Sequence, residues 1–212
     1  MYIIEIVEGI QGEGKYTGYP TTFVRTHGCN CRCTYCDTIY SYTQKRRKLN
    51  IEGIVKKVQQ LKNRYVCITG GEPLLQKDEV TMLVLELRSL NFEVSIETNG
   101  TIEIDYTPYR RTYSYTMDIK CPSSGSAELN NYNNLRVLQF NDEVKFVISD
   151  REDYDFAKKV LYKYPTNAKV IFSPCFNSKG ESNGLEIAGW LLEDKLTDVR
   201  IGLQIHKVLK IY

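Results

Sequence analysis

A cluster of cysteines dominates the chemistry that this sequence can perform. Four of its seven cysteines fall within eight residues, and three of them, Cys29, Cys33 and Cys36, have the spacing C-x-x-x-C-x-x-C. Three thiolates on one short loop can each bind one iron of a four-iron four-sulfur cluster and leave the fourth iron without a protein ligand. An open coordination position is typical of a reactive metal site rather than a structural one. The spacing therefore predicts a reactive iron-sulfur centre.

Two other metal sites could use the same cysteines. A structural zinc site would take Cys31 as its fourth ligand, but zinc ribbons usually pair two C-x-x-C units or add histidines, and His27 is the only histidine nearby. A four-cysteine electron carrier would take a distant ligand from Cys67, Cys121 or Cys175. We expect those three to be small buried apolar side chains. Cys31 is expected to fill space beside the cluster, because a fourth thiolate would close the open position.

The composition is that of an ordinary globular chain of 212 residues, with 42% hydrophobic and 25% charged residues. Such a chain buries a sizeable core without help from metals or disulfides, and we predict a single domain over residues 1–212. The net charge of +2 argues against nucleic-acid binding. The sequence shows neither a leader pattern nor an apolar run of membrane-spanning length. These features predict no membrane contact and a cytoplasmic location, where thiols stay reduced.

Short β-branched or aromatic runs alternate with helical patterns, an order typical of parallel β-α-β construction. The predicted strands cover residues 3–7, 22–26, 65–69, 93–97, 113–119, 143–148, 169–173 and 199–204. Helical spacing of apolar residues predicts four helices, between the capping Asn50 and Asn63, over 78–90, between the capping Asp150 and Pro165, and over 185–195. The polar, asparagine-rich stretch 123–141 is predicted to be a loop.

The number of strands is too low for eight complete βα units, so an α/β fold with an open partial barrel or a doubly wound sheet is expected. Polar residues stand at or just past the carboxyl ends of five predicted strands. They are Thr69 to Glu72, Glu97 to Gly100, Asp118 with Lys120, Ser173 to Cys175, and Gln204 with His206. Because these strand ends converge on one edge of a parallel sheet, the residues are expected to form one site.

Together with two further motifs, the cysteine spacing resembles that of the radical S-adenosylmethionine superfamily. Thr69-Gly-Gly-Glu-Pro73 is similar to the superfamily's GGEP motif, in which glycines let the backbone approach the cofactor, and Tyr35 stands at its usual aromatic position. The resemblance implies a partial βα barrel reduced in helices. It also implies that the open iron chelates S-adenosylmethionine, whose one-electron cleavage gives a 5′-deoxyadenosyl radical. No side chain is then required as a general base.

A closer resemblance covers essentially the whole chain. Gln11-Gly-Glu-Gly14, Phe23-Val-Arg25, Cys36-Asp-Thr38 and Gln204-Ile-His-Lys207 are together similar to the 7-carboxy-7-deazaguanine synthases. The resemblance implies a ring-contracting lyase that converts 6-carboxy-5,6,7,8-tetrahydropterin to 7-carboxy-7-deazaguanine with loss of ammonia, on the route to queuosine and related deazapurines. It also implies a homodimer and a requirement for Mg²⁺.

The same resemblance implies roles for individual residues. Those implied to contact the pterin substrate are Ile10, Gln11, Gly12, Glu13, Arg25, Thr69, His206 and Tyr212. Those implied to contact S-adenosylmethionine are Tyr35, Cys36, Asp37, Gly71, Glu72, Lys120, Ser173, Pro174, Cys175 and Phe176. Thr38 is implied as a magnesium ligand, in keeping with the preference of this cation for oxygen. Two motifs depart from the common pattern, since Asp118-Ile-Lys120 replaces Ser-Pro-Lys and Ser173-Pro174 replaces Gln-Pro.

Two other functions stay open on the sequence alone. A small glycyl-radical activating enzyme shares the cysteine triad but leaves Arg25, Thr38 and His206 without roles, and a zinc-binding interaction module would use the cysteines for structure only. The iron-sulfur reading also requires an electron donor. The basic run Lys45-Arg-Arg-Lys48 is either a solvated loop or a docking site for an acidic donor, flavodoxin or ferredoxin.

Overall fold

One open sheet organises the chain. The computed structural model describes residues 1–106, 111–177 and 180–210. Within them nine strands pair in the order β3-β1-β2-β4-β5-β6-β7-β8-β9. Their bounds are β1 Tyr2–Ile10, β2 Pro20–Thr26, β3 Arg47–Lys48, β4 Tyr65–Gly70, β5 Glu93–Thr98, β6 Ser114–Ile119, β7 Glu143–Ile148, β8 Lys169–Pro174 and β9 Val199–Ile201. The order places β3 and β9 at opposite edges, which confirms the predicted open α/β architecture.

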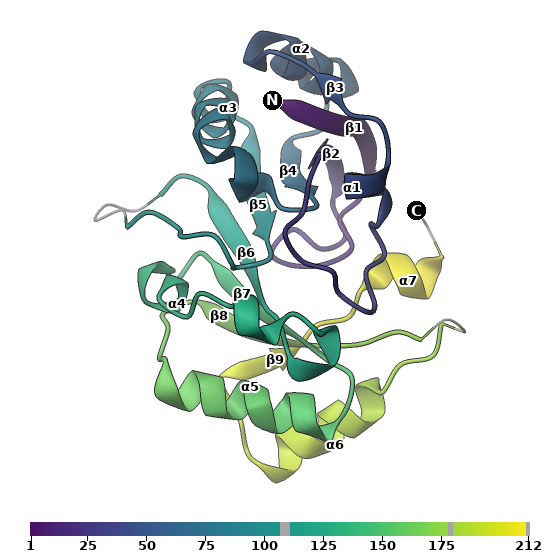
Figure 1. Cartoon of the computed structure of the whole chain (residues 1–212), viewed down its shortest axis with the longest axis vertical. Helices are drawn as coiled ribbons and strands as arrows, with labels where there is room; N and C mark the ends of the chain where they lie inside the picture. The colour runs from purple at the N-terminus through teal and green to yellow at the C-terminus, as the bar shows by residue number, and fades with distance from the viewer. Residues whose placement is uncertain (107–110, 178–179, 211–212) are drawn as a thin grey trace.

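The four longer helices lie on one face of this sheet, and their bounds are α2 Ile51–Leu61, α3 Lys77–Ser89, α5 Arg151–Lys163 and α6 Gly184–Glu193. The shorter helices are α1 Tyr40–Thr43, α4 Asn134–Val137 and α7 Ile205–Leu209. Figure 1 shows α2 and α3 beside the first half of the sheet and α5 and α6 beside the second half. Asn50 and Asp150 cap α2 and α5 as predicted, each accepting a hydrogen bond from a backbone N–H three residues on. No helix of the described residues is both long enough and apolar enough to cross a membrane.

Side chains alternate between the two faces of the sheet along β2 and β4 to β8. Val24, Ile68, Ile96, Met117 and Phe146 point toward the helices and are fully or almost fully buried in the apolar core. The opposite, inner face carries polar residues on six neighbouring strands. They are Arg25, Thr69, Glu97, Thr116, Asp118, Glu143, Lys145 and Ser173. Parallel strands covered on both faces are usually apolar throughout, so a polar inner face marks a site.

The structure differs from the sequence prediction where elements are short or where the chain turns back. The first strand runs to Ile10 and is antiparallel to both β2 and β3, because a hairpin rather than a helix connects it to β2. The last strand stops at Ile201, which frees Gln204 to contact Glu13. The predicted loop 123–141 contains α4 and two single 3-10 turns. Elements of two to five residues, such as β3, α1 and α7, are too short to give a periodic signal.

Candidate active site

The cysteine loop connects β2 to α1 at the carboxyl edge of the sheet. Cys29, Cys33 and Cys36 are all partly exposed, and the backbone N–H of Cys36 closes a turn on the carbonyl of Cys33 at 3.2 Å. Thr34 fastens this turn to the segment after β6, since its N–H and hydroxyl donate to the carbonyls of Ser124 and Ser123 at 3.1 and 2.7 Å. The three thiols therefore sit on a braced loop that remains accessible from outside.

The two glycines of the Thr69-to-Pro73 motif pack directly against the start of this loop. The N–H of Glu72 donates to the carbonyl of Gly28 at 2.8 Å. A Cβ atom on Gly71 would collide with that carbonyl and with the Cβ of Cys29, and one on Gly70, where φ is +135°, would collide with the backbone of Thr26. Only glycine permits this approach. The motif thus lies beside the first cysteine of the triad.

The side chain of Glu72 holds this arrangement together from inside. It is fully buried, and its carboxylate accepts hydrogen bonds from Leu74 N at 2.8 Å, Thr98 Oγ1 at 2.8 Å and Asn99 N at 2.6 Å. Burial raises the pKa of Glu72 to about 7, although these three donors act in the opposite direction. The backbone N–H and carbonyl of Glu72 are bonded to Gly28 and Leu75, so all of its polar groups are engaged within the protein.

Asn99 links the same core to the cysteine loop, a role that the sequence analysis missed. Its side-chain amide donates to Asn30 Oδ1 at 2.9 Å and to the sulfur of Cys31 at 3.3 Å, with Cys29 Sγ at 3.9 Å. The side-chain oxygen of Asn99, Oδ1, accepts hydrogen bonds from the backbone N–H and the hydroxyl of Thr101. The signal was present, because Asn99 belongs to the polar stretch after β5, but its spacing to the cysteines is not local.

The thiols themselves fit the ligands of an iron-sulfur cluster. Hydrogen bonding from Cys31 lowers the pKa of Cys29 and that of Cys33 to about 6, and the charge of Lys120 acts in the same direction. A lowered pKa favours the thiolate, the form that binds iron. Cys31 is buried, and the pKa of its thiol is raised by its two cysteine neighbours and by burial. Its backbone N–H donates to Cys29 Sγ at 3.4 Å.

The remaining three cysteines differ in burial. Cys67 and Cys121 are fully buried, as predicted for small apolar side chains, whereas the same prediction is wrong for Cys175, which is partly exposed because it lies just past the end of β8. Among the described residues, no three His, Cys, Asp or Glu side chains converge closely enough to hold one metal ion. A cluster needs no such convergence, because each of its irons takes a single thiolate.

Arg25, Thr69 and Glu97 form the polar inner face next to the cysteine loop. Arg25 and Thr69 are paired neighbours on β2 and β4, and Thr69 Oγ1 donates to Glu97 at 2.8 Å. The Nε of Arg25 is bound to Glu5 at 2.9 Å, and its two terminal nitrogens make no hydrogen bond within the described residues. Arg25 thus offers a free fork to a carboxylate, the role implied by the resemblance.

Glu97 was expected in the site only as part of the polar stretch after β5, without a role, and the structure gives it one. Its second oxygen accepts a hydrogen bond from Gln11 Nε2 at 3.0 Å. Burial raises the pKa of Glu97, and the charge of Glu13 raises it further. Glu97 therefore ties two predicted substrate residues, Gln11 and Thr69, to one buried carboxylate.

A buried ammonium, Lys145, completes the inner face. It contacts Glu13 Oε1 at 2.7 Å and Asp118 Oδ1 at 3.2 Å, and Asp118 also pairs with Lys120 at 2.7 Å. Burial lowers the pKa of Lys145, but the carboxylates of Asp118, Glu13 and Glu97 outweigh it and hold the pKa well above its usual range. A cavity of about 240 Å³ opens beside this network and is lined in part by Glu13, Lys145 and Ser173.

The β1–β2 hairpin and the segment after β9 meet beside this network. Gln204 Nε2 donates to Glu13 Oε2 at 3.0 Å, and the N–H of Ile205 donates to the carbonyl of Gly12 at 3.0 Å. The imidazole of His206 lies against Gly12 so closely that a Cβ atom there would overlap it. Burial lowers the pKa of His206. The predicted Gln11-to-Gly14 turn and the predicted Gln204-to-Lys207 motif therefore form one structure.

The remaining predicted residues surround this centre. Tyr35 is partly buried, and its hydroxyl is buried without a hydrogen-bond partner among the described residues. Asp37 pairs with Lys207 at 3.3 Å, and Thr38 Oγ1 lies 3.8 Å from Cys36 Sγ. Ile10 ends β1, and the segment Ser173 to Phe176 spans the carboxyl end of β8, with Ser173 and Pro174 inside the strand. Tyr212 lies outside the described residues.

One family model and several named proteins are similar to this chain. The family model described as the radical SAM superfamily matches residues 23–108. Proteins named 7-carboxy-7-deazaguanine synthase are similar over 99% of this chain. They include those of Methanospirillum hungatei, 44% identical over 85% of its own length, Koribacter versatilis, 40% identical over 96%, and Thermoplasma acidophilum, 37% identical over 97%.

A solved structure agrees in fold. The crystal structure of QueE from Escherichia coli has a TM-score of 0.73 and 21% sequence identity, and the match covers 96% of this chain and 93% of that one.

The contact between Gly12 and His206 gives a direct test of this site. Gly12→Ala is expected to push the imidazole out of its buried position, so that the pKa of His206 rises toward its ordinary value. The chain has only two histidines, and a proton NMR titration of the metal-free protein reads both, with His27→Gln for assignment. Gly189→Ala is the matched control, because a Cβ there meets nothing within 4 Å. An unchanged pKa in Gly12→Ala would contradict the geometry.

Proposed function

The chain belongs to the 7-carboxy-7-deazaguanine synthase family of radical S-adenosylmethionine enzymes, and we propose on this basis how its own residues carry out the family's reaction. That reaction converts 6-carboxy-5,6,7,8-tetrahydropterin to 7-carboxy-7-deazaguanine with loss of ammonia. The observation that carries the assignment is the 44% identity to a named synthase over 99% of the chain. The activating-enzyme and zinc-module alternatives are thereby set aside.

Cys29, Cys33 and Cys36 hold the four-iron four-sulfur cluster in this proposal. With S-adenosylmethionine bound, the cluster supplies the one-electron chemistry that starts the reaction. The protein contributes thiols of lowered pKa and a glycine turn, Gly70 and Gly71, packed against the cysteine loop. The amine and carboxylate of S-adenosylmethionine would bind to the backbone of this turn. The cofactor's other contacts are Tyr35, Asp37, Lys120 and the segment from Ser173 to Phe176.

The substrate occupies the polar inner face between Arg25 and His206. Arg25 binds the substrate carboxylate through its free fork, because only its Nε is engaged with Glu5. Gln11 and Thr69 meet the flat pterin edge, and Glu97 fixes the orientation of both. Gly12 and Glu13 line the hairpin side of the site. Lys145 and Gln204 hold Glu13 in place through an ion pair and a hydrogen bond. Ile10 and Tyr212 complete the predicted substrate contacts.

Turnover by the reconstituted protein tests the assignment. Protein with an intact cluster, reductant, Mg²⁺ and S-adenosylmethionine is expected to convert the carboxytetrahydropterin to the deazapurine, and no product would overturn the function.

Arg25→Gln is expected to lower kcat/KM about 100-fold, because a charge-assisted bidentate contact is lost. Arg25→Lys should not restore it, since an ammonium lacks the fork. Arg151→Gln, on the exposed surface of α5, is the matched control.

Thr38 is proposed to ligate Mg²⁺ through its hydroxyl, with the remaining positions filled by water and substrate oxygens. Its Oγ1 lies beside the third cysteine of the triad, 3.8 Å from the sulfur. Thr38→Ala is expected to abolish the stimulation of turnover by Mg²⁺, whereas Thr38→Ser keeps the hydroxyl and the response. A magnesium response in Thr38→Ala equal to that of the unmodified protein would remove Thr38 from the metal site.

An acidic donor, flavodoxin or ferredoxin, is proposed to reduce the cluster through the basic run. Lys45, Arg46, Arg47 and Lys48 are all exposed and directly follow α1, the helix after the cysteine loop. Reversing the charges of Lys45 and Arg47 to Glu should slow turnover driven by flavodoxin at low salt and leave turnover driven by dithionite unchanged. Equal loss with both reductants would place the defect elsewhere.

The homodimer that the family resemblance implies is also proposed for this chain. Its mass in solution is measured by light scattering.

A further inference from the structure

A second cavity lies at the edge of the sheet opposite to the cysteines. It has a volume of about 260 Å³ and is lined by residues that precede β6 and β7, by the start of β5, by the end of α3 and by the β1–β2 hairpin. We call it the basal cavity. Its lining residues are Lys15, Tyr16, Arg88, Glu93, Arg111, Thr112, Tyr113 and Asn141. No residue assigned to the cluster, S-adenosylmethionine or the pterin is among them.

The basal cavity carries an excess of positive charge. Three of its lining residues are cationic and one, Glu93, is acidic. Glu93 already accepts contacts from Arg88 at 3.1 Å, Arg64 at 3.6 Å and the hydroxyl of Tyr16 at 3.4 Å. Counting Arg64, and also Asp142, which pairs with Arg111, leaves four cations against two carboxylates. The excess is two positive charges by either count.

The arginines are fixed parts of the wall. Arg88 donates through Nη1 to the carbonyl of Phe92 as well as to Glu93. Arg111 is almost fully buried, pairs with Asp142 and lies over the rings of Tyr113 and Tyr115. A guanidinium held in this way keeps its charge without needing to reorganise when an anion binds.

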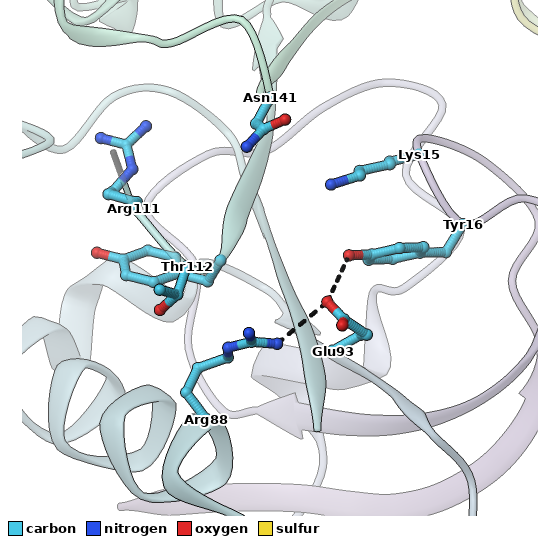
Figure 2. Close-up of a pocket in the computed structure, with 8 residues that line it drawn as sticks. Lys15, Tyr16, Arg88, Glu93, Arg111, Thr112 and Asn141 are labelled. Carbon is cyan, nitrogen blue, oxygen red and sulfur yellow. Dashed lines mark hydrogen bonds and ion pairs between the residues drawn. The ribbon is translucent and has the colours of Figure 1, made fainter. Parts of the chain in front are cut away.

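Lys15 is the exposed member of this set. Its ammonium lies 5.2 Å from the centre of the Tyr16 ring and is paired with no carboxylate among the described residues. Figure 2 shows Lys15 on one side of the cavity and Arg88, joined to Glu93, on the other, with the amide of Asn141 above. An anion placed there meets donors from three different elements.

We propose that the basal cavity binds a phosphate group. A doubly charged oxyanion matches the excess of two positive charges, and its oxygens match the donors of Lys15, Arg88, Thr112 and Asn141. The cavity is smaller than the 300 to 1,000 Å³ that is usual for drug-sized ligands, about the scale of a phosphate with little attached. The ligand is therefore inorganic phosphate or the end of a small phosphate monoester.

The site lies on the reverse side of the substrate turn. Lys15 and Tyr16 directly follow Gln11 to Gly14, and the hairpin is closed on itself by hydrogen bonds from Gly18 N to Gln11 O at 2.8 Å and from Tyr19 N to Tyr16 O at 3.0 Å. A phosphate that bridges Lys15 to the wall of the sheet fastens this hairpin from outside. Binding should therefore stabilise the folded state as well as neutralise charge.

Calorimetric titration of the cluster-containing protein with inorganic phosphate, without Mg²⁺, measures the binding. Saturable 1:1 binding and a rise of Tm with phosphate are expected, with chloride at equal ionic strength as the reference. A parallel titration with ribose 5-phosphate separates free phosphate from a monoester as the preferred source. Lack of saturable binding of both compounds would overturn the proposal.

Variants locate the site. Lys15→Gln is expected to weaken phosphate binding about tenfold through the loss of one charge-assisted contact, and Lys15→Glu to abolish it. Lys57→Gln, at an exposed lysine of α2, is the matched control and should bind as the unmodified protein does. Binding that survives Lys15→Glu but is lost in Arg25→Gln would mean that phosphate occupies the substrate site, which contradicts the proposal.

Discussion

The buried ammonium of Lys145 is the constraint around which the inner face is built. A charge removed from water is costly unless opposite charges surround it. Lys145 obtains them from Glu13 on the hairpin and Asp118 on the neighbouring strand, and Glu13 is held in turn by Gln204. Satisfying this one charge thus draws the β1–β2 hairpin, the middle of the sheet and the C-terminal segment to the same point. The substrate residues Gln11, Gly12 and His206 lie on the elements that it brings together.

Glycines decide how closely these elements can approach. At Gly71 the absence of a side chain lets the motif after β4 touch the cysteine loop, and at Gly12 it lets the imidazole of His206 lie on the hairpin. Each contact joins a segment that carries chemistry to one that holds it in place. Glu72 and Asn99 secure the first contact from inside, because their polar atoms are bonded to both segments. The cofactor end and the substrate end of the site therefore use the same kind of packing.

Much of the fold could be predicted because its signals are local. The caps Asn50 and Asp150 and the apolar spacing behind them placed α2 and α5, and β-branched runs placed the central strands. The antiparallel pairing of the first strand, β3 and α7 were not predicted, since an antiparallel partner or a helix of five residues leaves no periodic trace. Lys145 was missed for a related reason, and Glu97 and Asn99 were placed in the site without their roles. Each of the three acts through a contact with a residue far away in the sequence, which local spacing does not reveal.

The sequence by itself determined the chemistry: the triad of Cys29, Cys33 and Cys36, the glycine motif at Gly70 and Gly71, and the polar residues at strand ends are all local patterns. Only the tertiary structure decided which charges are compensated. Among the described residues, it bound only the Nε of Arg25 to a carboxylate, enclosed Lys145 among carboxylates, and placed Lys15 beside the basal cavity without a carboxylate partner. The physical reason is that a charge is defined by its surroundings, and those surroundings come from strands and loops far apart in the chain.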